Sequence, residues 1–258
     1  MPTWDPSQYL KFSDHRVRPA LDLMARIPFA APRTIHDLGC GPGTITRLLA
    51  ERWPDAAVTG VDSSADMLAK ARHEAPGVTF ELADIAFWSP PAPADLLFSN
   101  ATLHWLDDHA LLLPRLIAHL APGGVLAIQV PCNHASPSHL LIEEVAAEDR
   151  WCAKLAGVRQ VYRSVEAPEA YYRMLAPLLS DLDIWETTYF HVLDGENAVV
   201  EWTKGTALRP YLDALDEPAR GAFLAAYQAR IAAAYPKQPD GHTLLPFRRL
   251  FLVGRAPG

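Results

Sequence analysis

The residues with the clearest chemical meaning form a short string from Asp37 to Thr44, in which Gly39, Gly41 and Gly43 alternate with other residues. Glycines at this spacing let the backbone turn sharply, and they let a ligand approach main-chain N–H groups beside the positive end of a following helix. Such a loop suits a carboxylate or a phosphate. The dinucleotide-binding pattern needs glycine at its first, third and sixth positions, and Thr44 occupies the sixth when counting starts at Gly39. The string therefore disfavours NAD as the ligand. A tight strand-to-helix turn without a ligand, in another kind of α/β protein, stays an alternative.

Two acidic residues follow at the ends of later β-rich runs. Asp62 closes the second run about 20 residues after the loop, a place from which a carboxylate can accept hydrogen bonds from both hydroxyls of a ribose. A solvated acid at a strand end is the alternative. Asp84 follows the third run, and taken alone it is better explained as a helix N-cap.

The elements that must position these residues are indicated by the alternation of apolar patterns. Between residues 33 and 130, short β-rich runs alternate with helical patterns, which is typical of βαβ units in a parallel sheet. We expect strands over residues 34–38, 57–61, 78–82, 95–99 and 124–130. A helical stretch over 139–179 follows, then a strand over 184–192, helices over 197–203 and 217–234, and a last strand over 249–253.

Composition narrows the class of protein. The chain has 258 residues, half of them hydrophobic, and a formal net charge of -7, so a broad basic surface for nucleic acid is not expected. Its three cysteines lack the paired spacing of a zinc site and are expected to be free thiols in a reducing compartment. There is no leader pattern and no run of about 18 apolar residues. We expect a cytoplasmic protein that is a monomer or a weak homodimer.

The pattern acidic-x-Gly-x-Gly-x-Gly, together with Asp62, Asp84 and the segment from Ser99 to Trp105, resembles the class I S-adenosylmethionine-dependent methyltransferases. The resemblance implies a doubly wound, Rossmann-like, seven-stranded and mostly parallel sheet whose last strand is antiparallel. It implies one domain over residues 1–258, with a core over about 30–131, C-terminal strands over about 183–192 and 247–254, and helical cover over the active site at about 135–180 and 196–240. The cofactor residues that it implies are Tyr9, Asp37, Gly39, Gly41, Asp62, Ser63, Met67, Asp84, Ile85 and Asn100.

Beyond this core, the whole chain is similar to the trans-aconitate methyltransferases, which esterify a carboxylate of a small tricarboxylic acid. The similarity lies in residues 4–12, 103–105, 202–210 and 246–249. A polycarboxylate bound by an acidic protein needs local cations, ideally bidentate arginines. The substrate-binding candidates are His104, Trp105, Lys204, Arg209 and Arg248. The alternative for each cation is ordinary surface charge, and for Trp105 it is core packing.

The expected reaction is a displacement in which a substrate carboxylate oxygen attacks the sulfonium methyl group, without a metal. A carboxylic acid is already ionised at neutral pH, so no general base is required. His104 would act as a base only if the nucleophile were a hydroxyl, an amine or a carbon acid. Methylation of a malonyl carrier protein or of a secondary metabolite stays open, as does a non-catalytic cofactor-binding protein.

Overall fold

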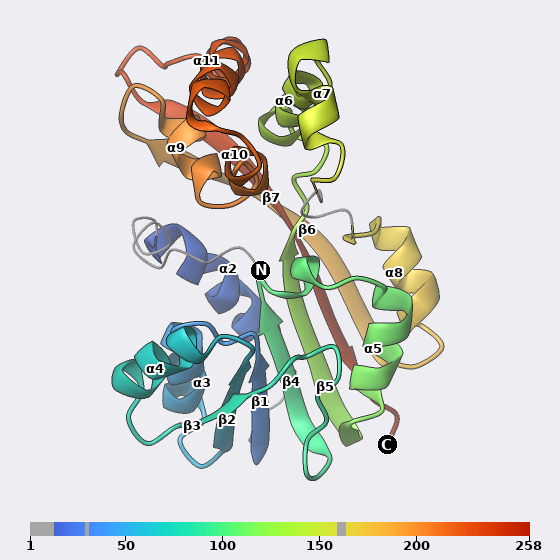
Figure 1. Ribbon diagram of the computed structural model, residues 1–258. Coiled ribbons are helices and arrows are strands. Elements are labelled where there is room, and N and C mark those ends of the chain that lie inside the picture. Colours follow the sequence, from blue (N-terminus) through green and yellow to red (C-terminus); the bar gives the residue numbers. More distant parts are fainter. Residues whose placement is uncertain (1–12, 29–30, 159–163) are drawn as a thin grey trace. The chain divides into compact units, whose positions relative to one another are not determined.

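The computed structural model describes residues 13–28, 31–158 and 164–258 (Figure 1). Backbone contacts divide the chain into two compact units. The sheet unit comprises Arg16–Pro131, Ser164–Thr187 and Arg249–Gly258. The helical unit comprises Thr188–Arg248 and the described parts of Met1–His15 and Cys132–Arg163. The expectation that both belong to one domain stays a prediction.

The sheet has seven strands in the order β3-β2-β1-β4-β5-β7-β6. The strands are β1 (Thr34–Leu38), β2 (Ala57–Asp62), β3 (Thr79–Leu82), β4 (Ala94–Asn100), β5 (Leu120–Pro131), β6 (Ser180–Leu193) and β7 (Thr243–Arg255). Six run parallel and β7 is antiparallel, as its register with β5 shows. The order reverses between β1 and β4, so the fold is doubly wound, and ligands of such sheets bind at the carboxyl ends of the strands next to this reversal.

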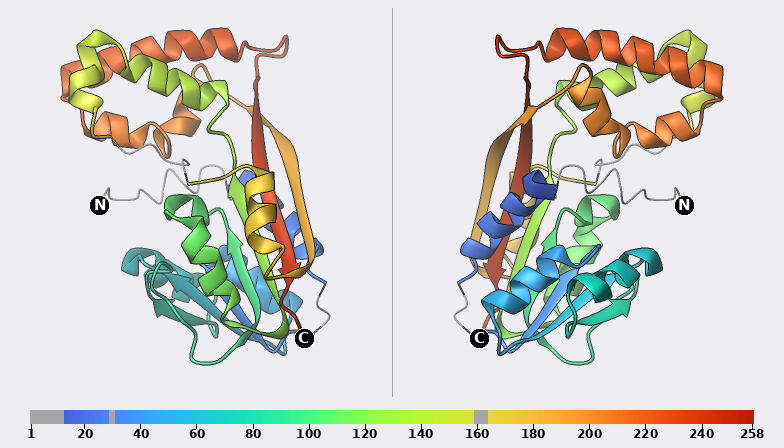
Figure 2. Two further views of the ribbon diagram at one scale, coloured as in Figure 1. Left: turned by 90° about the vertical axis from the view of Figure 1, so that its right-hand side faces the viewer. Right: turned by 90° about the vertical axis from the view of Figure 1, so that its left-hand side faces the viewer.

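Helices cover both faces of the sheet, because a parallel sheet must bury both sides of its strands. Figure 2 shows α2 (Ser13–Ala25) and α3 (Thr44–Arg52) on one face, with α5 (His109–Ile117) and α8 (Pro168–Leu175) on the other. The helix α4 (Ala65–Glu74) joins β2 to β3. The central strand β4 is correspondingly apolar, and Leu96, Leu97 and Phe98 are fully buried.

The helical unit has a core of its own. It contains α6 (Pro137–Ala146), α7 (Asp149–Leu155), α9 (Ala198–Lys204), α10 (Arg209–Asp213) and α11 (Glu217–Ala234). Phe223, Tyr227 and Ile231 of α11 are buried, and the Tyr227 hydroxyl donates a 2.8 Å hydrogen bond to the carbonyl of Ser138 at the start of α6. No helix in the described part of the chain is long and apolar enough to cross a membrane.

The helices within the expected cover segment over residues 135–180 fall into both units. The helices α6 and α7 belong to the helical unit, whereas α8 belongs to the sheet unit and packs on α5. Periodicity reveals that a helix has an apolar face, but it does not reveal which core that face packs against. The two C-terminal strands also extend beyond their expected bounds, over Ser180–Leu193 and Thr243–Arg255.

Candidate functional site

The loop after β1 is built from three glycines in left-handed conformations, with φ of +80° at Gly39, +54° at Gly41 and +84° at Gly43. The N–H groups of Gly39 and Cys40 donate to the carbonyl of Val61 at 2.7 and 3.0 Å, which ties the loop to β2. A Cβ atom at Gly39 would lie 2.1 Å from Thr102 Cγ2, whereas one at Gly41 would meet nothing within 4 Å. Gly39 is therefore required by packing, and Gly41 borders open space.

Asp62 ends β2 directly beside this loop. Its Oδ2 accepts the N–H of Gly41 at 2.9 Å, and its Oδ1 accepts the N–H of Ser64 at 2.8 Å. An ionised carboxylate has about four lone-pair positions, so two remain for a ligand. Ser64 caps α4 by accepting the Met67 N–H at 3.3 Å. One turn thus carries three predicted residues, Asp62, Ser63 and the buried Met67.

The segment after β3 is a turn and not the start of a helix. Asp84 Oδ1 accepts the Ala86 N–H at 2.9 Å, and no helix lies between β3 and β4, a stretch that is fully described. The N-cap explanation for Asp84 is therefore wrong. Ile85 is buried, and Arg115 of α5 donates to the carbonyls of Ile85 and Trp88. The turn is held from the side of α5.

Asp37 lies beneath the loop. It is 2% exposed, and its Oδ2 accepts the Thr46 hydroxyl at 2.7 Å. Burial raises the pKa of the Asp37 carboxyl to about 7; the negative charge of Asp62 adds to this shift and the Thr46 hydrogen bond opposes it. Its contacts therefore brace the loop against the first turn of α3.

The turn after β4 closes the other side of the site. Ala101 has φ of +54°, and its N–H donates to the Gln129 carbonyl at 2.9 Å. The Thr102 hydroxyl donates to the Gly39 carbonyl at 3.1 Å, which joins this turn to the glycine loop. Asn100 Oδ1 is buried and accepts no hydrogen bond from any described residue. A buried acceptor of this kind has a position to offer to a donor group of a ligand.

Leu103–Trp105 form a short 3-10 helix, η1, directly after this turn. His104 is buried and packs against Trp105 at 5.0 Å between ring centroids, while Trp105 is 40% exposed. The Ser164 hydroxyl donates to the His104 carbonyl at 3.0 Å. Trp105 is therefore not a core residue, and the two predicted substrate residues of the sheet unit lie side by side.

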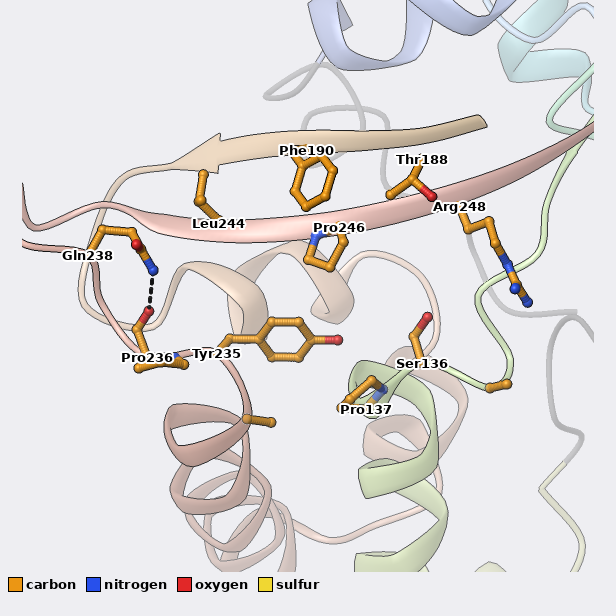
Figure 3. Close-up of a pocket in the computed structure, with 12 residues that line it drawn as sticks. Ser136, Pro137, Thr188, Phe190, Tyr235, Pro236, Gln238, Leu244, Pro246 and Arg248 are labelled. Atoms are coloured by element: carbon orange, nitrogen blue, oxygen red, sulfur yellow. Dashed lines mark hydrogen bonds between the residues drawn. The ribbon is translucent and has the colours of Figure 1, made fainter. Parts of the chain in front are cut away.

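The three predicted cations lie in the helical unit. Lys204 pairs with Glu201 at 2.5 Å and Arg209 with Asp213 at 3.5 Å, each within a helix. Arg248 lines a cavity of about 550 Å³. Figure 3 shows Arg248 and Ser136 at one end of this cavity and Gln238 at the other.

The rest of that cavity is largely apolar, and Phe190, Leu244 and Pro246 come from the β6–β7 ribbon (Figure 3). The remaining predicted residue, Tyr9, lies outside the described residues. Within the described part of the chain, no group of three or more His, Cys, Asp or Glu residues could hold a metal ion.

Comparison with known proteins places this arrangement in a family. A methyltransferase domain model matches residues 35–124. Proteins named trans-aconitate 2-methyltransferase from Rhodopseudomonas palustris (strain BisB18) and Azoarcus sp. (strain BH72) are each 54% identical over 98% of this chain and 99% of their own length. The chain belongs to the trans-aconitate 2-methyltransferase family.

Solved structures support the fold. Phosphoethanolamine N-methyltransferase 2 of Haemonchus contortus, solved with S-adenosylhomocysteine, is 18% identical with a TM-score of 0.54 over 93% of this chain and 53% of that chain. A Bacillus halodurans protein assigned as a methyltransferase is 14% identical with a TM-score of 0.58 over 93% of this chain and all of that chain. The class I methyltransferase fold expected from the sequence is confirmed.

Two residues that shape the site escaped the sequence-based prediction. Thr46 supports Asp37, and Arg115 fixes the turn after Asp84. Thr46 acts across the turn between consecutive elements, and Arg115 acts from an element about 30 residues away. A threonine in a first helical turn and an arginine on an amphipathic helix carry no signal that distinguishes them from surface residues.

Proposed function

We propose that this chain transfers a methyl group from S-adenosylmethionine to a carboxylate of trans-aconitate, giving the monomethyl ester and S-adenosylhomocysteine. The observation that carries the proposal is the 54% identity, over nearly the full length of both chains, with relatives named for this reaction. That similarity spans the glycine loop, the turn after β4 and the helical unit alike.

The residues of the sheet unit suit this methyl donor. Asp62 keeps acceptor positions for the two ribose hydroxyls, and the space beside Gly41 admits a ligand against the loop. Asn100 Oδ1 can accept from the ammonium group of the methionine portion. The residues proposed to hold the cofactor are Tyr9, Asp37, Gly39, Gly41, Asp62, Ser63, Met67, Asp84, Ile85 and Asn100. When bound, S-adenosylmethionine supplies the methyl group that becomes the ester methyl.

The chain's own contribution is binding, alignment and the exclusion of water. A substrate carboxylate with a pKa near about 4 is ionised at neutral pH and needs no proton removed. We assign His104 to orienting the substrate, because it is buried on a tethered turn beside Trp105. Lys204, Arg209 and Arg248 are the proposed cationic contacts of the substrate. A small-molecule substrate also suits the net charge of -7, which disfavours nucleic acid.

A methyl-transfer panel tests this function. The purified protein is incubated with methyl-labelled S-adenosylmethionine and trans-aconitate, cis-aconitate, citrate, isocitrate or malonyl carrier protein, and base-labile ester is counted. We expect a strong preference for trans-aconitate. Calorimetry with S-adenosylhomocysteine accompanies the assay. Binding without turnover of trans-aconitate would overturn the substrate, and absence of binding would overturn the cofactor as well.

A further inference from the structure

A buried histidine in the sheet unit lies outside the chemistry described so far. His109 is the first residue of α5 and is 4% exposed. Its Nδ1 lies 2.6 Å from the hydroxyl of Tyr171 on α8, and its Nε2 lies 2.9 Å from the carbonyl of Leu103. Tyr171 is 1% exposed, and its hydroxyl accepts the Glu166 N–H at 3.3 Å.

With a neutral His109 ring, these contacts assign a direction to every hydrogen bond in the chain of groups. The Leu103 carbonyl can only accept, so His109 Nε2 carries a proton and donates to it. In a neutral ring Nδ1 is then an acceptor, and the Tyr171 hydroxyl donates to it while accepting from Glu166. A Glu166–Tyr171–His109–Leu103 relay results in which each of these groups is satisfied, so α8 is connected to the first carbonyl of η1.

The turn at the end of this relay is tethered along its whole length. Ala101 is tied to β5, Thr102 to the glycine loop and His104 to Ser164. The left-handed φ of Ala101 costs a non-glycine residue on the order of 1 kcal/mol, so it persists only where neighbouring contacts over-determine it. Leu103 is held by a hydrogen bond from the His109 side chain of α5, and the His109 ring is in turn held by the Tyr171 hydroxyl of α8.

We propose that Tyr171 and His109 are positioning residues for methyl transfer, which hold the turn from Ala101 to Trp105 in the form that receives the acceptor acid. This inference rests on the proposed function, in which His104 and Trp105 of that turn face the substrate. The relay acts through the turn and touches no reacting atom. The glycine loop is also bonded to β2 through Gly39 and Cys40, so we expect loss of the relay to change donor binding less than methyl transfer.

Tyr171→Phe is the first variant, because it removes one hydroxyl and keeps the ring. We expect kcat/KM for trans-aconitate to fall about tenfold, as loss of one buried hydrogen bond allows, while the Kd for S-adenosylhomocysteine changes less than about twofold. The matched control is Tyr172→Phe, which removes the same atom from the neighbouring, exposed residue of α8 and should leave both values unchanged. Equal kinetics for the two variants would overturn the proposal.

Histidine variants separate positioning from loss of folding. Gln at position 109 can place an amide N–H where Nε2 donates to Leu103, and Leu cannot. We therefore expect His109→Gln to retain several-fold more kcat/KM per folded molecule than His109→Leu, with folded fraction measured by circular dichroism. Tyr171→Phe should add little further loss in the His109→Gln background, because the relay is already cut. Full additivity would contradict a shared pathway.

A spectroscopic readout keeps this test independent of turnover. In the wild-type protein, ¹⁵N spectra of the His109 ring should show a protonated Nε2 and an unprotonated, hydrogen-bonded Nδ1, and Tyr171→Phe should shift the Nδ1 resonance. A protonated Nδ1 in the wild type would overturn the relay. If the wild type methylates another acid of the panel and not trans-aconitate, the proposed substrate fails, and the same kinetic comparison is made with the acid that is methylated.

Discussion

At the scale of single residues, Asp62 has the sharpest consequence for the methyl donor. Its two oxygens hold the N–H groups of Gly41 and Ser64, and its remaining lone pairs are those proposed for ribose. Asp62→Ala should therefore raise the Kd for S-adenosylhomocysteine by at least about tenfold, the effect of losing two charge-assisted hydrogen bonds. Calorimetric titration measures this. Asp66→Asn, which changes an exposed acid in the first turn of α4, is the control. Unchanged affinity in Asp62→Ala would remove Asp62 from the site.

The raised pKa of the Asp37 carboxyl predicts that the stability of the protein depends on pH. Burial raises the pKa of its carboxyl in the folded protein to about 7, above the value of 3.8 that an unperturbed Asp has. Between about pH 4 and pH 7 the folded state then binds more protons than the unfolded state, so this group makes stability fall as pH rises. Asp37→Asn should raise Tm relative to the wild type at pH 8 and change it less at pH 4. Thermal unfolding across this range measures the difference, and an equal effect at both values would show that Asp37 titrates normally.

At the scale of elements, the loop between β1 and α3 contains one glycine that packing requires, Gly39, and one that borders open space, Gly41. Gly39→Ala would drive a Cβ to 2.1 Å from Thr102, so we expect a loss of several kcal/mol of unfolding free energy. Gly41→Ala meets no atom within 4 Å, so it should cost only about 1 kcal/mol of backbone strain. Its methyl group would enter the space proposed for the donor, so we expect weaker S-adenosylhomocysteine binding. Denaturant melts and titrations of both variants test the pair, and equal destabilisation would refute the distinction.

The same loop shows why much of the fold could be predicted from the sequence. The strands β1, β2 and β4 are short, mostly apolar runs bounded by turn residues, and the glycine spacing marks where β1 meets a helix. The sequence pattern did not indicate which element packs against the apolar face of each helix. Tyr171 lies on an amphipathic helix in a region expected to be one cover, yet it packs beside α5 through His109. Asp84 is a residue type that commonly caps helices, but a turn follows it, and Arg115 of α5 donates a hydrogen bond to the Ile85 carbonyl of that turn. Long-range contacts decided both outcomes.

At the scale of the whole molecule, the predicted site residues are divided between two units with separate cores. The described residues that are proposed to bind the donor belong to the sheet unit, and Lys204, Arg209 and Arg248 belong to the helical unit. The local ion pairs of Lys204 and Arg209 are also what ordinary surface residues form, so their geometry alone does not assign them to substrate. Arg248 differs, because it lines a cavity.

This division makes a prediction about which ligand each unit affects. Arg209 and Arg248 are proposed to bind a polyanion and belong to the helical unit, whereas the described residues proposed for the donor belong to the sheet unit. Replacing either arginine by Ala should therefore raise the KM for trans-aconitate and leave the Kd for S-adenosylhomocysteine unchanged. We expect about a tenfold rise or more, the range for a hydrogen bond to a charged group. The control is Lys237→Ala, which removes an exposed cation of the same unit that pairs with Glu196 and should change neither constant.

Raising the salt concentration should also raise the KM of the wild type more than that of the Arg248→Ala variant, because fewer charge contacts remain to be screened in the variant. If Arg209→Ala and Arg248→Ala both behave like Lys237→Ala, these arginines are surface charges and the acid is held by other groups.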